Sequence, residues 1–193
     1  TRLMRLIQQV LEFRKVESGN LKICVSYGDI SSFLRSCAEA FIPLLGKRRQ
    51  LLSFESTPDI IFGFFDADKL DKIVYNLLSN AAKYTPEGGQ ICVRAALADE
   101  YTLQIDVTNT GELMTQKTID GLFKRFYEGD YRRHNTIGTG IGLALVKDLV
   151  ALHHGTIEAF SNEQTGNCFR IMLPVDKETY RQEELDETVA AQR

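Results

Sequence analysis

The feature that most constrains this chain is a long amphipathic pattern from Asp68 to Tyr84. It has the spacing of an α-helix that buries one face. Pro86 and the Gly88-Gly89 pair end the pattern. The apolar positions that recur three and four residues apart are Leu70, Ile73, Val74, Leu77, Leu78 and Ala81. The chain must therefore contain one long helix whose apolar face packs against other elements.

Periodicity predicts the other elements on both sides of this helix. Residues 110–138 lose the pattern, as in a lid or a binding loop. Residues 175–193 are charged and poor in apolar positions, as in a linker or tail. The expected helices cover about 3–19, Asp29 or Ser31 to about Gly46, and 141–154, and the expected strands cover 21–25, 51–55, 60–66, 90–98, 101–109, 155–162 and 168–174.

Composition excludes several classes of protein. The 193 residues are 44% apolar and 25% charged, as in a globular chain of one domain and some extra length. The formal net charge of −3 disfavours nucleic-acid binding. The four cysteines form no C-x-x-C pair, which argues against a zinc knuckle or a disulfide framework and favours a location in a reducing cytosol. Thr1 falls within a helical pattern, so we expect a fragment of a longer protein.

A glycine-rich run, Gly138-Thr-Gly-Ile-Gly-Leu143, immediately precedes an apolar helix. Glycines let the backbone approach a ligand, and a helix N-terminus offers free N–H groups to a phosphate. The run is neither the dinucleotide fingerprint nor a P-loop. Its alternative interpretation is a turn that fits a helix against a sheet.

Two further groups of polar residues suggest binding. Asn76, Asn80 and Lys83 share one helix face, where amide oxygens suit Mg²⁺ and an ammonium suits phosphates. The alternative is a plain solvated face. Asn109-Thr-Gly111 ends a strand and suits the exocyclic amine of a base, or equally forms an Asx turn.

Together these segments resemble the catalytic domain of sensor histidine kinases. The resemblance covers about residues 26–175, and residues 11–19 resemble the end of the dimerisation and phosphotransfer hairpin of hybrid sensors. The four boxes of that domain are recognised in order at 76–86 (N box), 107–111 (G1 box), 122–127 (F box) and 138–145 (G2 box).

The resemblance implies an α/β (α+β) two-layer sandwich of the Bergerat type. Helices would cover one face of a mixed β-sheet and hold ATP beneath a lid. Residues 1–20 would be the C-terminal part of the dimerisation helix, residues 21–175 the ATP-binding catalytic domain, and residues 176–193 a linker or tail.

The resemblance also implies ATP and Mg²⁺ as cofactors and assigns roles to residues. Asn80 would bind Mg²⁺ with support from Asn76, and Lys83 would contact phosphates. Tyr84, Asn109 and Gly111 would surround the adenine. The phosphate-binding hinge would comprise Gly138, Thr139, Gly140, Ile141, Gly142 and Leu143, and the lid would be anchored by Phe123 and Phe126.

The sequence departs from the family pattern at three positions. Asn109 replaces the adenine-binding aspartate, which predicts nucleotide binding weaker by ~1 to 2 kcal/mol. Leu113 replaces a glycine, and Glu128 stands where an arginine is common. Asn76 occupies the place of the glutamate that activates water in the hydrolysing relatives, which favours phosphoryl transfer over hydrolysis.

None of the three histidines, His134, His153 and His154, lies in a phosphoacceptor motif. We therefore expect a hybrid sensor kinase domain that transfers the γ-phosphoryl of ATP to a histidine absent from this chain, for relay to a receiver aspartate. The expected partners are its own hairpin in a homodimer and a receiver domain, on the cytoplasmic side of a membrane-anchored sensor. The alternative is a degenerate kinase that binds nucleotide or supports a dimer without turnover.

Overall fold

A five-stranded mixed sheet forms one layer of the computed structural model, which describes residues 2–124 and 141–186. The strand order is β2-β4-β5-β7-β6, with β2 and β4 parallel and the other neighbours antiparallel. The strands are β2 (Leu51–Thr57), β4 (Gln90–Leu97), β5 (Thr102–Asn109), β6 (Thr156–Asn162) and β7 (Gly166–Pro174).

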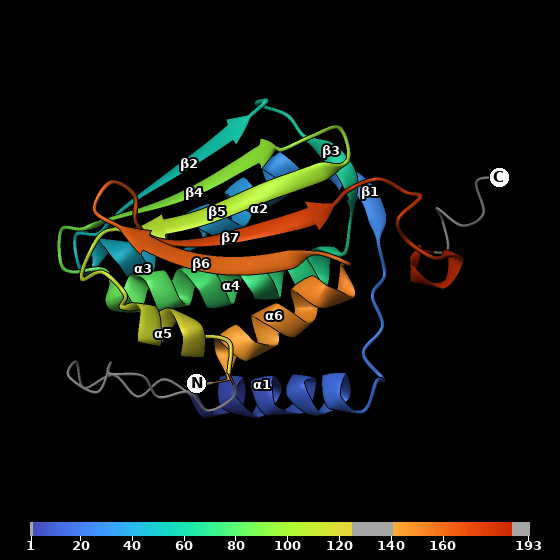
Figure 1. Ribbon diagram of the computed structural model, residues 1–193, viewed down its shortest axis with the longest axis horizontal. Helices are drawn as coiled ribbons and strands as arrows, with labels where there is room; N and C mark the ends of the chain where they lie inside the picture. The colour runs from blue at the N-terminus through green and yellow to red at the C-terminus, as the bar shows by residue number, and fades with distance from the viewer. Residues whose placement is uncertain (1, 125–140, 187–193) are drawn as a thin grey trace.

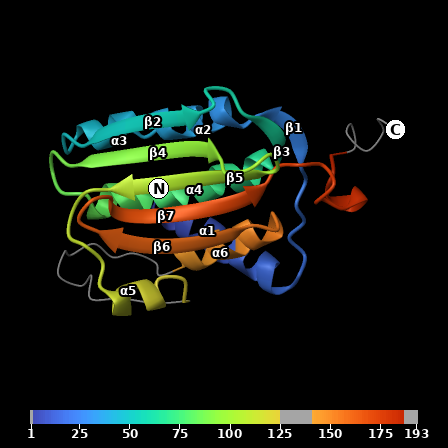
Figure 2. The ribbon, with the colours of Figure 1, turned by 45° about the horizontal axis from the view of Figure 1, so that its top comes forward.

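Helices form the second layer on one face of this sheet (Figure 1). Figure 2 turns the sheet toward the viewer, and the described helices lie behind it or beside it. The helix α1 lies beyond α4 and α6, on the side away from the sheet (Figure 1). The helices are α1 (Arg2–Glu17), α2 (Ile30–Glu39), α3 (Ile42–Gly46), α4 (Ala67–Tyr84), α5 (Gln116–Gly121) and α6 (Gly142–Leu152).

The core lies between the two layers, and the strand alternation accounts for it. Every second residue of β4 and β5 is buried against the helices, as at Val93 and Ile105. The helix α4 contributes its predicted apolar face, and Leu70, Leu77 and Leu78 are completely buried. The predicted two-layer sandwich with a mixed sheet is thus confirmed.

A second, two-stranded sheet joins β1 (Ser26–Asp29) to β3 (Phe62–Phe65). Beside it, residues 176–186 pack back onto the fold instead of extending away from it. Tyr180 and Leu185 from this segment form a small buried cluster with Ile23 and Val25. The segment that sequence patterns describe as a linker or tail is therefore packed up to Asp186, and it includes the 3₁₀ turn η2 (Gln182–Glu184).

Three element predictions are wrong. The segment expected to be irregular from residue 110 contains the helix α5. The expected strand at 21–25 is an extended linker whose Ile23 and Val25 enter the small cluster, and the strand begins only at Ser26. The expected helix ending near Gly46 is divided into α2 and α3. Pro43 lies in the first turn of α3, where a proline lacks the N–H that would continue a helix from the preceding turn.

Candidate functional site

The N-box helix α4 presents its polar side chains away from the core. Asp66 caps its N-terminus by accepting the Lys69 backbone N–H at 3.0 Å. The side chains of Asn76, Asn80, Lys83 and Tyr84 are all half-buried along one side. The Lys83 ammonium lies 4.9 Å from the centre of the Tyr84 ring. A cation and an aromatic ring thus lie together at the end of α4.

Asn76 links α4 to the helix that follows the glycine-rich run. Its Oδ1 lies 2.9 Å from the point that a Cβ on Gly142 would occupy. Its Nδ2 donates to the Lys72 carbonyl at 2.8 Å, and its Oδ1 accepts from Gln9 Nε2 at 3.0 Å. Only a glycine therefore leaves room for the start of α6 against the amide face of α4.

Asn80 is the residue best suited to hold a metal ion. Among the residues that the structure describes, its side chain makes no hydrogen bond, and it is half-exposed. An amide oxygen in this state fits Mg²⁺ carried by a nucleotide. Within residues 2–124 and 141–186, no group of three or more acidic, histidine or cysteine side chains forms a metal site.

The G1 segment lies at the end of β5, next to the end of α4. Asn109 is 5% exposed, and its Nδ2 donates to the Thr110 carbonyl at 3.0 Å, so its Oδ1 remains as an acceptor. Gly111 has φ +139°, and a Cβ there would lie 3.0 Å from the Tyr84 carbonyl oxygen. Glycine at this position lets the loop cross the end of α4.

The remaining predicted site residues have different outcomes. Phe123 is half-buried and packs edge-on against Phe169 of β7, with ring centres 6.3 Å apart. Ile141 is buried, and Leu143 is half-buried against the core. Outside the described residues lie Phe126, Gly138, Thr139 and Gly140.

A buried asparagine that the sequence reading missed holds the G1 loop. Asn167 Nδ2 donates to the Glu112 carbonyl at 2.9 Å, and its Oδ1 accepts the Met114 N–H at 3.1 Å. The same Oδ1 accepts from Ser161 Oγ at 2.7 Å. An asparagine at the start of an otherwise apolar strand was the available signal, because a buried amide needs partners.

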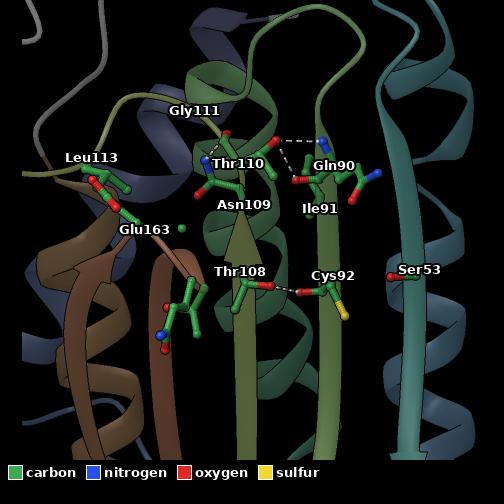
Figure 3. A pocket seen from close by; sticks show the side chains of 13 residues that line it. Ser53, Gln90, Ile91, Cys92, Thr108, Asn109, Thr110, Gly111, Leu113 and Glu163 are labelled. Atoms are coloured by element: carbon green, nitrogen blue, oxygen red, sulfur yellow. Dashed lines mark hydrogen bonds between the residues drawn. The ribbon is translucent and has the colours of Figure 1, made fainter.

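A cavity of about 470 Å³ lies at the same end of the sheet. Figure 3 shows Asn109 and Gly111 among its lining residues, with Gln90 and Cys92 on the neighbouring strand. No side chain of α4 lines it. It lacks the lysine and the amide pair that suit phosphates and Mg²⁺, so the site is better defined by α4, the G1 segment and the start of α6.

One buried histidine fastens the far ends of α4 and α6. His153 is fully buried, its Nδ1 lies 3.0 Å from the Leu149 carbonyl, and its Nε2 accepts the Asp66 N–H at 3.3 Å. Burial lowers the pKa of His153. Its two partners are satisfied by the neutral ring that carries its proton on Nδ1, so the histidine has a structural role.

Residues 65–177 match the family described as histidine kinase-, DNA gyrase B- and HSP90-like ATPase. The chain belongs to this family. The resemblance inferred from the four boxes is thereby confirmed, and the domain is a histidine kinase-like ATPase catalytic domain.

Histidine kinases are also among the similar curated proteins. Histidine kinase P4 of Formosa agariphila is 32% identical over 91% of this chain and 13% of its own length. The sensor histidine kinase WalK of Bacillus subtilis is 31% identical over 92% of this chain and 29% of its own length. The chain thus spans less than a third of either relative.

Solved structures support the fold. The catalytic domain of histidine kinase ThkA superimposes with a TM-score of 0.72 at 21% identity, covering 81% of this chain and 99% of that one. Full-length ShkA in complex with AMPPNP gives a TM-score of 0.79 at 24% identity, covering 90% of this chain and 36% of that one. No described helix is both long and apolar enough to cross a membrane.

Proposed function

We propose that this chain is the ATP-binding catalytic domain of a hybrid sensor histidine kinase. It would transfer the γ-phosphoryl group of Mg-ATP to a histidine outside this chain, for relay to a receiver aspartate. The contact between Asn76 and the start of α6 carries the proposal, because it brings the amide face of α4 to the end of the glycine-rich run. The domain would act on the cytoplasmic side of a membrane-anchored sensor.

In this function the chain binds and orients the nucleotide. Asn80 would hold Mg²⁺ with support from Asn76, and Lys83 would contact the phosphates. Mg²⁺ would neutralise charge on the phosphates. The acceptor atom Asn109 Oδ1 would receive a hydrogen bond from the adenine amine, and Gly111 would leave room for the ring.

Asn76 favours transfer over hydrolysis. An amide cannot remove a proton from water, and both of its polar atoms are already hydrogen-bonded, to Lys72 and to Gln9. Among the residues assigned to the site, none is a carboxylate that could serve as a general base. The proposed domain therefore positions ATP for a histidine acceptor supplied by the hairpin.

A second candidate is a nucleotide-binding or dimer-scaffolding module without turnover. The neutral Asn109 favours it, because a carboxylate would make a stronger, charge-assisted hydrogen bond to the adenine amine. The two candidates differ in transfer, and the dimer-scaffolding form of the module does not require nucleotide binding.

Calorimetry with Mg-ATP, followed by transfer to a purified hairpin carrying the histidine, tests the proposal. The unmodified chain should bind and transfer, and Asn80→Ala should reduce affinity about tenfold or more with Mg²⁺ present and little in its absence. Asn20→Ala, in the exposed linker, is the matched control. Binding without transfer would favour the module, and no binding at all would contradict the kinase and leave only the dimer-scaffolding form of the module.

A further inference from the structure

The segment that follows the last strand folds back and is fastened at both ends. Val175 is buried in the main core. Tyr180 is 5% exposed, and its hydroxyl donates to the Pro174 carbonyl at 2.6 Å. Leu185 is 9% exposed in the small cluster with Ile23 and Val25. We call residues 176–186 the clasp.

The clasp pairs with the linker that connects α1 to the ATP-binding fold. Val25 and Leu185 form a parallel bridge. The Val25 N–H donates to the Glu184 carbonyl at 2.7 Å, and the Asp186 N–H donates to the Val25 carbonyl at 2.8 Å. Figure 1 shows the clasp beside this linker, where it descends to α1. Backbone hydrogen bonds on both sides of Val25 thereby fix the linker to the clasp, as between two paired strands.

The same linker is tied to the beginning of α4. The Cys24 N–H donates to Asp66 Oδ2 at 2.8 Å, and Asp66 Oδ1 caps α4. The Asp66 side chain is 4% exposed, so this buried carboxylate depends on its partners. One residue therefore fixes both the linker and the N-terminus of the nucleotide-binding helix.

A second connection closes the ring through α6. Asp66 donates its N–H to His153 at the end of α6, as described above. The adjacent His154 contacts the Glu184 carboxylate of the clasp with its Nε2 at 3.0 Å. Clasp, linker, α4 and α6 thus form a closed set of contacts at the end of α4 remote from Asn80.

The linker begins where the helix α1 ends, at Glu17. The polar contacts of α1 with α4 include Gln9 to Asn76 and the ion pair of Glu12 with Lys72, both near the middle of α4. A helix of this length is marginal in water by itself, so α1 depends on docking. At Val25 the clasp holds the linker that leads out of α1.

We propose that the clasp is a regulatory device that controls the docking of α1 on α4, and so the access to Asn76. A closed clasp holds the linker against Asp66 and keeps Gln9 on Asn76. An open clasp releases the linker and lets α1 leave. The role of Asn76 in nucleotide binding rests on the proposed function, whereas the docking of α1 on α4 does not.

Hydrogen exchange of matched variants tests the proposal. Leu185→Asp places a carboxylate in the apolar cluster and should open the clasp, and Gln182→Asp adds the same charge at an exposed position of the same segment. We expect amides of the linker and of α1 to exchange about tenfold faster in Leu185→Asp and at the original rate in Gln182→Asp. Exchange in α4 should not change. Faster linker exchange with unchanged α1 exchange would overturn the proposal.

A disulfide that keeps the clasp attached to the linker tests the same proposal without destabilising the fold. Cys24 Sγ lies 3.8 Å from the Asp186 carboxylate. In Asp186→Cys, the new thiol can form a disulfide with Cys24. Excess oxidised glutathione accepts the two electrons and two protons that the two thiols release, and mass spectrometry checks that the disulfide has formed. The oxidised protein should show slower α1 exchange than its reduced form. Equal exchange in both forms, or failure of the disulfide to form, would count against the clasp.

These experiments separate the inference from the proposed function. All exchange is measured without nucleotide, and Mg-ATP binding by the unmodified chain is measured separately. A chain that binds no nucleotide but shows clasp-dependent docking contradicts the proposed function alone. A chain that binds nucleotide but shows no dependence of α1 on the clasp contradicts the inference alone.

Discussion

A substitution of Asn109 tests whether this residue recognises the base of the nucleotide. The Nδ2 of Asn109 is held by the Thr110 carbonyl, which leaves Oδ1 as the proposed acceptor for an adenine amine. In Asn109→Asp, a carboxylate should strengthen that hydrogen bond and raise Mg-ATP affinity about five- to thirty-fold, equivalent to ~1 to 2 kcal/mol. Mg-GTP affinity should not rise, because guanine offers a carbonyl at that position. Calorimetry with both nucleotides measures this, and an equal loss for both would contradict the assignment.

His153 predicts a pH dependence of stability. Burial lowers its pKa in the folded chain, while the unfolded chain keeps an ordinary value near 6.5. Below about pH 6.5 the unfolded state therefore binds more protons, so the free energy of unfolding should fall as the pH decreases from 7.5 to about 5.5. Chemical denaturation across this range measures the slope.

The control separates this histidine from its neighbour. His153→Gln should lower stability by about 1 to 3 kcal/mol at pH 7.5, because buried partners lose their hydrogen bonds, and should flatten the slope. His154→Gln, at the more exposed position, should keep the slope. A slope that survives His153→Gln and disappears in His154→Gln would refute the assignment.

At the scale of elements, the junction of α4 and α6 can be tested by a pair of glycines. In Gly142→Ala the new Cβ would meet Asn76 Oδ1 at 2.9 Å, whereas in Gly46→Ala it would meet nothing within 4 Å. Both changes raise helix propensity, so their difference reports the contact. We expect Gly142→Ala to weaken Mg-ATP binding about tenfold and Gly46→Ala to leave it unchanged, by calorimetry. Equal affinities would mean that the junction does not shape the site.

Element prediction succeeded where local pattern and tertiary packing agree. The helix expected at 68–84 is α4 (Ala67–Tyr84), because its apolar face is the one that the sheet buries. It failed at 21–25, where Ile23 and Val25 cluster with Leu185, far along the chain, and not with a neighbouring strand. Short-range periodicity cannot reveal a partner that distant.

The site residues show the same division between features that a local pattern predicts and features that depend on distant partners. The polar face of α4 and the end of β5 were predicted, because helical spacing and strand ends are local properties. Asn167 and Gln9 were missed, since each acts only through contact with a remote residue, the Met114 backbone and the Asn76 side chain respectively. Sequence reading finds residues that could face a ligand more readily than those that hold them in place.

In the whole molecule, α1 presents an apolar face that the rest of residues 2–124 and 141–186 does not cover. Its exposed apolar residues are Leu3, Met4, Ile7, Val10 and Leu11. We expect concentration-dependent self-association, which Leu11→Asp should abolish and Gln8→Asp, at an exposed polar position, should not. Sedimentation equilibrium measures both. A monomeric unmodified chain at the highest attainable concentration would contradict this prediction.

The order of strands also affects how the protein is made. The central strand β5 pairs with β4, its predecessor, and with β7, which ends at Pro174. During synthesis, one edge of β5 must wait until residues 166–174 have left the ribosome, with its hydrogen-bonding groups open to other chains. A stalled or truncated product lacking β7 should therefore be a target for chaperones and proteases.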